Sequence, residues 1–469
     1  MIADLKPYAE YRDSGLPWLG PIPAHWEIAR SKRLFVERKQ YAGPDDVQLS
    51  ATQAYGVIPQ AQYEARSGYR VVKISMHLDK RRRVEKDDFV ISMRSFEGGL
   101  ERAWASGAIR SSYVVLKPTA AVDPGYFRYF FKSVPYISAL RATANFIRDG
   151  QDLNFGNFAA VPLPLIPLNE QAAIARFLDW ANGRLERAIR AKRNVIALLN
   201  EQRQAIIDRA VTIGLAEDVA LTPFGVPWLG NIPQHWKIWR IGQFAKVGNG
   251  STPSRAKPSY WDGGSYPWMN SSQVNRGRID SADQFVTALA LRECHLPRVP
   301  AGSLLVAITG QGKTRGKAAI LDIEATISQH TAYIAPRIPV ASAEFLQLAL
   351  AAAYRPLRAM SDDNGSTKGA ITCEDLKRFK LPMPPRAEQD RLAERVAIEV
   401  RAVADASCRL DREVELLSEY RTRLIADVVT GQLDVRDATT HLPVEARADS
   451  TPEGMDEERA DADEEEVSS

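Results

Sequence analysis

Cysteine is scarce in this chain, and long apolar runs are absent from it. The 469 residues include three cysteines, Cys294, Cys373 and Cys408, which form no C-x-x-C pair. This spacing favours inert thiols over a disulfide framework or a zinc site. No segment approaches the roughly 18 apolar residues that a membrane-spanning helix needs. Residues 1–15 also lack the features of a signal peptide, so we expect a cytoplasmic protein without membrane contact.

Motifs that would mark an enzyme are also missing, with one exception. The six histidines show no metal-ligand spacing, and neither a methyltransferase motif nor a nuclease carboxylate–lysine cluster is present. The exception is AITGQGKT at 307–314, which fits a relaxed phosphate-loop pattern. A true phosphate loop opens a helix, whereas residues 315–328 have the composition of a strand. We therefore favour a glycine-rich basic hairpin, and a P-loop nucleotide-binding regulator remains an alternative.

The charge of the chain is unevenly distributed. Residues 443–469 hold eleven acidic and two basic residues, a net charge of −9, although the whole chain carries +3. The remaining 442 residues therefore carry +12. A basic body followed by a separate acidic tail is typical of proteins that bind polyanions. We expect the tail, residues 436–469, to be disordered.

The chain contains the same set of motifs twice. GLPWLGPIPAHWEI at 15–28 recurs as GVPWLGNIPQHWKI at 225–238, with ten of fourteen positions identical. LPLIPLNEQ at 163–171 recurs as LPMPPRAEQ at 381–389. The segments between these motifs show little mutual similarity. This pattern predicts a duplicated scaffold that presents two different domains. We interpret His25 and His235 of the repeated I-P-x-H-W motif as structural residues beside buried tryptophans.

A long helix is predicted after each E-Q pair, over 169–212 and 388–430. Good helix formers dominate both segments, and Gly183 is their one glycine. Apolar residues at seven-residue spacing predict a coiled-coil seam, and the repeat favours antiparallel pairing. Lys192, Arg203 and Arg421 interrupt the seam and are either register-fixing residues or rim charges. The predicted seam residues are Leu178, Leu185, Leu199, Ile206, Val396, Val403, Leu410, Leu417 and Leu424.

The predicted fold class is therefore α+β, with two globular α/β domains joined by two antiparallel coiled-coil helices in a pseudo-twofold repeat. Short strands are expected at 71–74, 88–93, 112–118, 302–308, 317–321 and 331–336, with loops between them. The expected domain limits are 1–168, 169–214, 215–387, 388–435 and 436–469.

The loops of both globular domains contain residues suited to nucleic acid. Arginine matches guanine edges, glutamine matches adenine, and lysine and serine commonly contact phosphates. Each such residue also has an ordinary alternative as a solvated surface group. The candidates for DNA contact are Gln53, Tyr55, Arg82, Arg94, Ser95, Arg255, Ser271, Ser272, Gln273, Lys313, Arg315 and Lys368. A coiled-coil adaptor without DNA contact is the second alternative.

The doubled frame resembles the specificity subunit of type I restriction–modification systems. The resemblance covers about residues 11–435 and lies in the I-P-x-H-W motifs at 22–26 and 232–236 and in both L-P-x-x-P-x-x-E-Q hinges. The segments 107–118, 250–274, 327–336 and 365–385 also look like elements of its target recognition domains. The acidic tail has no clear counterpart in that family.

The resemblance implies a non-catalytic subunit that reads a split target in double-stranded DNA. It implies two adenine-N6 methyltransferase subunits that use S-adenosylmethionine and dock on the long helices. It also implies two translocase–nuclease subunits that use ATP and Mg²⁺. No cofactor is expected in this chain itself.

Overall fold

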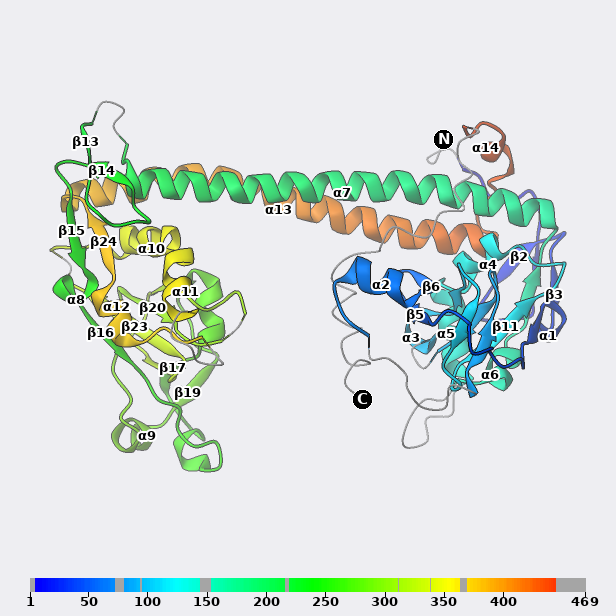
Figure 1. Cartoon of the computed structure of the whole chain (residues 1–469), viewed down its shortest axis with the longest axis horizontal. Coiled ribbons are helices and arrows are strands. Elements are labelled where there is room, and N and C mark those ends of the chain that lie inside the picture. The colour runs from blue at the N-terminus through cyan, green and yellow to red at the C-terminus, as the bar shows by residue number, and fades with distance from the viewer. Residues whose placement is uncertain are drawn as a thin grey trace. The chain divides into compact units, whose positions relative to one another are not determined.

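Two long helices are the elements that the sequence specifies most clearly. α7 spans Leu168–Thr212 and α13 spans Arg386–Val429, which confirms both predicted helices. The computed structural model describes residues 5–71, 80–92, 95–143, 153–215, 219–310, 312–337, 339–362 and 369–443 (Figure 1). Proline precedes both helices, at Pro167 and Pro385, and is absent within them, so no backbone N–H is lost inside either helix.

The chain divides into two units, and the boundary falls inside both long helices. Unit 1 comprises residues 1–192 and 412–469, and unit 2 comprises residues 193–411. This division follows packing, so each unit contains part of α7 and part of α13. The domain limits expected from the motifs remain predictions.

The two helices pack antiparallel in both units. In unit 1, Leu178 and Leu185 of α7 share a hydrophobic core with Leu424 of α13. In unit 2, Ile206 of α7 packs against the core that contains Val396 of α13. The start of α7 therefore contacts the end of α13, and the end of α7 contacts the start of α13. The other predicted seam residues are all buried or half-buried, namely Leu199, Val403, Leu410 and Leu417.

Two of the three polar interruptions of the seam form interhelical ion pairs in unit 1. Lys192 pairs with Glu413, and Arg421 Nη1 lies 3.7 Å from Glu186 Oε1. Arg203 lies in unit 2 and is exposed. Two of the interruptions therefore carry contacts that favour the observed register.

Unit 1 is built around a four-stranded sheet in the order β4-β11-β8-β9. An aromatic core packs beside it, in which Phe35 makes edge contacts with Phe89, Phe127 and Phe158. The strands predicted at 88–93 and 112–118 correspond to β8 and β11, whereas most of 71–74 lies outside the described residues. The further elements of unit 1 are β1 (Tyr11–Asp13), β2 (Pro21–Pro23), β3 (Glu27–Ala29), α1 (Ser31–Leu34), β4 (Phe35–Glu37), β5 (Leu49–Thr52), β6 (Gly56–Pro59), α2 (Gln60–Ser67), β7 (Arg82–Val84), β8 (Phe89–Ile91), α3 (Ser95–Gly98), β9 (Glu101–Arg102), β10 (Gly107–Ile109), β11 (Val114–Pro118), α4 (Pro124–Phe130), α5 (Val134–Ala142), α6 (Phe155–Ala160), β12 (Leu163–Leu165) and α14 (Arg436–Thr440).

Unit 2 is built around a five-stranded sheet in the order β16-β23-β20-β21-β18. Its central strands β20, β21 and β23 confirm the strands predicted at 302–308, 317–321 and 331–336. The further elements of unit 2 are β13 (Leu221–Pro223), β14 (Asn231–Pro233), β15 (Lys237–Arg240), α8 (Ile241–Phe244), β16 (Ala245–Asn249), η3 (Pro258–Tyr260), β17 (Tyr266–Met269), η4 (Ser271–Arg276), β18 (Arg278–Ile279), β19 (Gln284–Val286), α9 (Ala288–Glu293), β20 (Ser303–Ala307), β21 (Ala318–Leu321), β22 (Thr326–Ile327), β23 (Thr331–Pro336), α10 (Ala343–Ala352), α11 (Tyr354–Asp362), α12 (Cys373–Arg378) and β24 (Lys380–Met383).

The repeated motifs adopt the same structure in both units. The opening motif forms a small antiparallel pair, β1–β2 in unit 1 and β13–β14 in unit 2. Its next strand pairs with the strand at the start of the hinge, β3 with β12 and β15 with β24. In each unit, two segments far apart in the sequence therefore meet at the start of a long helix.

The C-terminal region differs from the sequence-based expectation. We predicted disorder from residue 436, but α14 is helical, and both Thr439 and Leu442 are buried in unit 1. Tyr11 donates from its hydroxyl to the carbonyls of Gly431 and Gln432, which holds this region against the N-terminal strands. The prediction is therefore wrong for α14, and residues 444–469 lie outside the described part of the chain.

Candidate nucleic-acid interface

The hinge glutamate of unit 1 binds three side chains at once. Trp26 Nε1 donates to Glu170 Oε1 at 2.9 Å, and the Tyr8 hydroxyl donates to the same oxygen at 2.7 Å. His25 Nε2 lies 2.7 Å from Glu170 Oε2. The glutamate side chain is only 4% exposed, so these partners replace water around a buried carboxylate. Glu170 thus joins the opening motif to the first turn of α7. We call this cluster of Glu170, Tyr8, His25 and Trp26 the node of unit 1.

The same node is present in unit 2 with a smaller set of partners. Trp236 Nε1 donates to Glu388 Oε1 at 3.1 Å, and His235 Nε2 lies 2.9 Å from Glu388 Oε2. The Glu388 side chain is 20% exposed. Both histidines therefore have structural partners, as the sequence predicted. The repeated I-P-x-H-W and E-Q motifs contact each other directly in each unit.

The glutamine of each E-Q pair fastens the long helix to its globular domain. Gln171 Oε1 accepts from the Asp123 N–H at 2.8 Å, and its amide donates to the carbonyls of Ala121 and Ile166. In unit 2, Gln389 repeats this arrangement with the Ser342 N–H and the carbonyls of Val340 and Pro384. Both glutamines are buried, at 1% and 0% exposure, and fully hydrogen-bonded. They fix the direction in which each domain leaves its helix.

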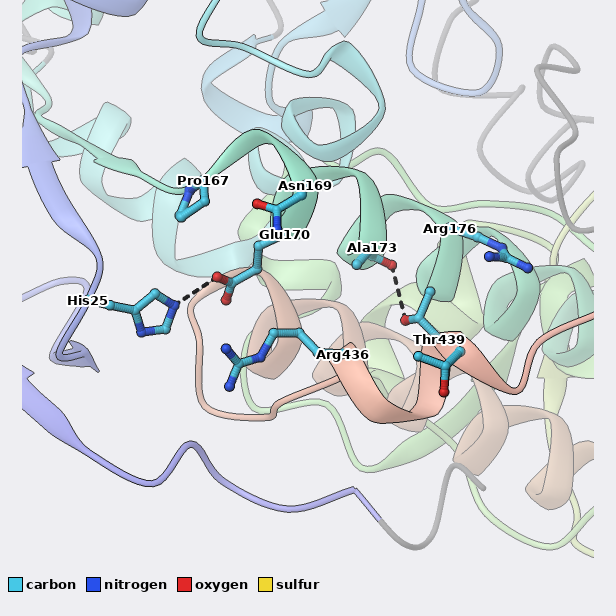
Figure 2. A pocket seen from close by; sticks show the side chains of 9 residues that line it. His25, Pro167, Asn169, Glu170, Ala173, Arg176, Arg436 and Thr439 are labelled. Atoms are coloured by element: carbon cyan, nitrogen blue, oxygen red, sulfur yellow. Dashed lines mark hydrogen bonds and ion pairs between the residues drawn. The ribbon is translucent and has the colours of Figure 1, made fainter.

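A cavity of about 420 Å³ lies beside the hinge of unit 1, where α14 covers the start of α7. Figure 2 shows His25 pointing to Glu170 and Thr439 pointing to the Ala173 carbonyl, with Arg176 and Arg436 at the wall. Arg176 donates to the carbonyl of Leu442 at 3.1 Å. These contacts explain why the polypeptide stays ordered beyond α13.

Burial and charge perturb several groups at this node. Burial, together with the hydrogen bond to Glu170, raises the pKa of Tyr8 well above its ordinary value, so its hydroxyl stays a donor. Burial also raises the pKa of Asp434, but hydrogen bonds from Arg436 outweigh it and leave that pKa below the usual value. The node is a positioning device, and no group in it is arranged as a nucleophile with an activating base.

The predicted DNA contacts of unit 1 fall into different environments. Gln53 and Tyr55 are half-buried near the β5–β6 turn, and the Arg66 guanidinium lies 5.4 Å from the Tyr55 ring centroid. Arg82 lies over the ring of Tyr41 at 5.3 Å. These three predicted contacts stay predictions, and Arg94 lies outside the described residues.

Ser95 is placed differently from the expectation. It is 1% exposed, and its hydroxyl accepts from the Ser92 N–H at 2.9 Å. Its side chain is therefore committed to the turn before α3, and in this conformation a DNA strand does not reach it.

In unit 2, the segment 270–276 forms η4 with a capping box. Gln273 accepts from the Asn270 N–H and donates to Asp283, and it is 2% exposed. Ser272 is exposed and Ser271 half-buried. The burial of Gln273 assigns it to holding η4, whereas the two serines remain candidates for DNA contact.

The glycine-rich basic segment at 307–314 lies in a β-hairpin, as predicted from the sequence. β20 pairs with β21 antiparallel, from Ser303 opposite Leu321 to Val306 opposite Ala318. No helix follows Lys313 before β21 begins, so a helix N-terminus for phosphate binding is missing from this described segment. The phosphate-loop alternative is therefore wrong.

The hairpin tip is held from two sides. Tyr354 of α11 donates to the Lys313 carbonyl at 2.8 Å, and Arg358 donates to the Gly312 carbonyl at 2.7 Å. From η4, Asn275 donates to Thr314 Oγ1 at 3.2 Å and accepts from Lys317 at 3.0 Å. Lys313 is exposed, whereas Arg315 is 3% exposed and therefore closed to a DNA strand in this conformation. Lys368 lies outside the described residues.

The role of several positioning residues was not predicted from the sequence. Glu170, Glu388, Gln171 and Gln389 were visible as a repeated E-Q pair, but their partners lie far away in the sequence. Asn275 lies two residues after the predicted triplet 271–273 and is not among the predicted residues, although its amide connects η4 to the hairpin. Duplication of the E-Q pair was the one available signal.

Neither a metal centre nor a membrane span is found in the described part of the chain. No three His, Cys, Asp or Glu side chains there are grouped so that they can hold a metal ion. Among the described helices, none combines the length and apolar character that crossing a membrane requires.

Similarity to a solved structure assigns the class of fold. A chain from a solved type I restriction–modification system, studied for its complex assembly and conformational transition, superimposes with a TM-score of 0.63. The identity is 16%, and the match covers 88% of this chain and 99% of that chain. The shared fold consists of mixed α/β domains attached to long paired helices.

Part of the chain is similar in sequence to known specificity subunits. Residues 233–397 match the family model of the type I restriction modification DNA specificity domain. The chain is 26% identical over 160 residues to the type I restriction enzyme EcoR124I/EcoR124II specificity subunit of Escherichia coli, covering 34% of this chain and 39% of that protein. It is 29% identical over 175 residues to the type I restriction enzyme MjaIX specificity subunit of Methanocaldococcus jannaschii, covering 37% and 39%. The matches thus span about two fifths of these relatives' lengths. Residues 233–397 therefore resemble a type I restriction–modification DNA specificity domain, and both relatives are named as specificity subunits.

Proposed function

We propose that this chain is the non-catalytic DNA specificity subunit of a type I restriction–modification system. In this proposal, each globular domain reads one half of a bipartite, asymmetric target in double-stranded DNA. The duplicated hinge carries the argument, because the same Glu–His–Trp node and the same glutamine fasten two dissimilar domains to equivalent helices. A frame that repeats while its domains differ suits the recognition of two different half-sites.

The side chains of the domains support a DNA partner. Arg255 and Lys313 lie exposed on loops of unit 2, Ser272 is exposed on η4, and all three offer donors to bases and phosphates. The net charge of +12 outside residues 443–469 also favours a polyanion. The function of the chain is therefore binding, and the chemistry belongs to its partners.

The partners in this proposal are two adenine-N6 methyltransferase subunits, which use S-adenosylmethionine, and two translocase–nuclease subunits, which use ATP and Mg²⁺. The complex acts in the cytoplasm, and this chain holds none of these cofactors. Support for two copies of one partner comes from Leu198 and Leu416. They occupy equivalent positions of the two helices, and they are 62% and 48% exposed.

The test is co-expression with the neighbouring methyltransferase gene in a host without N6-methyladenine, followed by genome-wide mapping of methylated adenines. We expect a single motif with two specified parts separated by unspecified bases. Unmodified DNA, or a contiguous motif, would contradict the proposal. Expression of the methyltransferase alone is the control and should leave the genome unmodified.

A further inference from the structure

Arg255 of unit 2 is an exposed arginine that lies against two aromatic rings. Its guanidinium carbon lies 3.6 Å from the ring centroid of Trp261 and 5.5 Å from that of Trp268. The two indoles contact each other edge to face, with centroids 5.3 Å apart. Contact with an aromatic face suits the planar guanidinium of arginine better than the compact ammonium of lysine.

The segment that carries Arg255 is fixed by both tryptophans. Trp261 Nε1 donates to the Ser254 carbonyl, and Trp268 Nε1 donates to the Ser251 carbonyl, each at 3.2 Å. Arg255 Nη2 donates to Gln284 Oε1 on β19. Backbone and side chain are thus ordered before any ligand arrives, which lowers the entropy lost on binding.

The charge of Arg255 is not neutralised by a carboxylate. Three other basic side chains of unit 2 are paired with carboxylates: Lys257 with Glu293 at 2.9 Å, Arg276 with Asp283 and Arg278 with Asp322. Among the described residues, no carboxylate forms an ion pair with Arg255. A guanidinium has five N–H donors, and Gln284 takes one of the hydrogen bonds they can form.

A purely structural role would not require this arrangement. Trp268 already belongs to a small hydrophobic core with Val286 and Ala290. Arg255 lies on the exposed side of it. Its remaining donors suit an acceptor pair, and the most common specific partner of an arginine in DNA is the O6 and N7 pair of guanine.

We propose that Arg255 is a specificity-determining residue that reads a guanine in the half-target of unit 2. The inference rests on the proposed function. Trp261 and Trp268 act as positioning residues, which hold the guanidinium plane where its two nitrogens donate to one base edge. Phosphate contact is the competing role, and it would give affinity without sequence preference.

The test uses the complex of this chain with its methyltransferase partner and the mapped target. Arg255→Ala and Arg255→Lys complexes are titrated, at fixed ionic strength, with duplexes in which each G·C pair of the second half-site is replaced in turn. We expect both variants to bind the cognate duplex about 5- to 160-fold more weakly, the cost of one bidentate base contact. At one G·C pair they should bind cognate and replaced duplexes equally. Lysine should not restore discrimination, because it lacks the planar fork.

The matched control is Arg278→Ala, which removes an exposed arginine already paired with Asp322 and should keep full discrimination. Two results overturn the inference: unchanged discrimination at every position, or an equal loss on all duplexes with a shallower salt dependence. The second result would assign Arg255 to a phosphate. If Arg255→Ala unfolds, the Arg255→Lys and Arg255→Gln complexes give the same readout. A wild-type complex that prefers no gapped target would instead contradict the proposed function itself.

Discussion

The indole of Trp26 donates its N–H to Glu170 across 144 residues of sequence, with 2.9 Å between Nε1 and Oε1. Trp236 and Glu388 repeat this relationship at 3.1 Å. One hydrogen bond therefore connects the two motifs that the chain contains twice. It links each opening strand pair to the first turn of a long helix, and we regard it as the element that fixes each domain on its helix.

The two hinge glutamates should differ in their contribution to stability. Glu170→Ala leaves the Tyr8 hydroxyl and Trp26 N–H without an acceptor in a buried site, so we expect a loss of about 3–5 kcal/mol. Glu388→Ala should cost about 1.5–3 kcal/mol, because water reaches that more exposed site. Denaturant unfolding of the three proteins measures both values. Glu394→Ala, at an exposed position of α13, is the control and should change stability by less than about 0.5 kcal/mol. Equal losses at both hinges would contradict this account.

Loss of the hydrogen-bond donor of a hinge glutamine side chain should destabilise its domain. Gln389→Glu keeps the size of the side chain but turns a donor toward the Val340 and Pro384 carbonyls into a repelling oxygen. We expect unit 2 to lose about 2–4 kcal/mol, from one unsatisfied buried group and a buried charge. Hydrogen exchange of the Ser342 amide, which donates to Gln389, reports the local loss. Unchanged protection of that amide would show that the glutamine does not fasten the domain.

Lys313 at the hairpin tip should act on DNA through charge alone. Lys313→Ala should weaken binding of the methyltransferase complex by a similar factor on target and non-target duplexes. The slope of log affinity against log salt concentration should fall by about one, since one phosphate contact is lost. Affinity titrations between 50 and 200 mM salt, about the usual working range, measure this slope. A loss confined to the target duplex would instead assign Lys313 to a base.

The contact of α14 should weaken in acid. The pKa of Asp434 lies below its ordinary value of 3.8, so its stabilising effect is complete above that value and is lost as the pH falls through the lowered pKa. Protonation would release Arg436, which donates to both Asp434 oxygens. Hydrogen exchange of the Thr439 amide between about pH 2.5 and pH 5, corrected for intrinsic exchange, should show the loss in the wild type. Asp434→Asn should remove the pH dependence, and an unchanged dependence would contradict the assignment.

Much of the frame could be predicted from the sequence because its signals are local. The hairpin at 302–321 follows from two apolar runs separated by a glycine-rich segment, and the strand at 331–336 follows from Thr331, Tyr333 and Ile334, residue types that favour strands. The long helices follow from seven-residue spacing and the absence of proline. Duplication added a second, independent observation of each motif, which is why the structural role of His25 and His235 could be predicted before their partner was known.

The contacts that depend on tertiary packing could not be predicted in this way. No local pattern indicates that Glu170 receives Trp26, or that Tyr11 holds the region after α13. Ser95, Gln273 and Arg315 have residue types suited to DNA, but packing buries each of them. Residue type identifies a capacity for hydrogen bonding, whereas exposure decides whether that capacity is available to a ligand.

Exchange of one domain tests the central claim most directly. Residues 239–380 are replaced by a second copy of residues 29–162, so that both hinges carry the domain of unit 1, and methylated adenines are mapped after co-expression with the methyltransferase. The account predicts that the asymmetric motif disappears and that a gapped palindrome, made of the first half-site twice in inverted orientation, takes its place. A complex that still methylates the original asymmetric motif would contradict the claim that each domain reads its own half of the target.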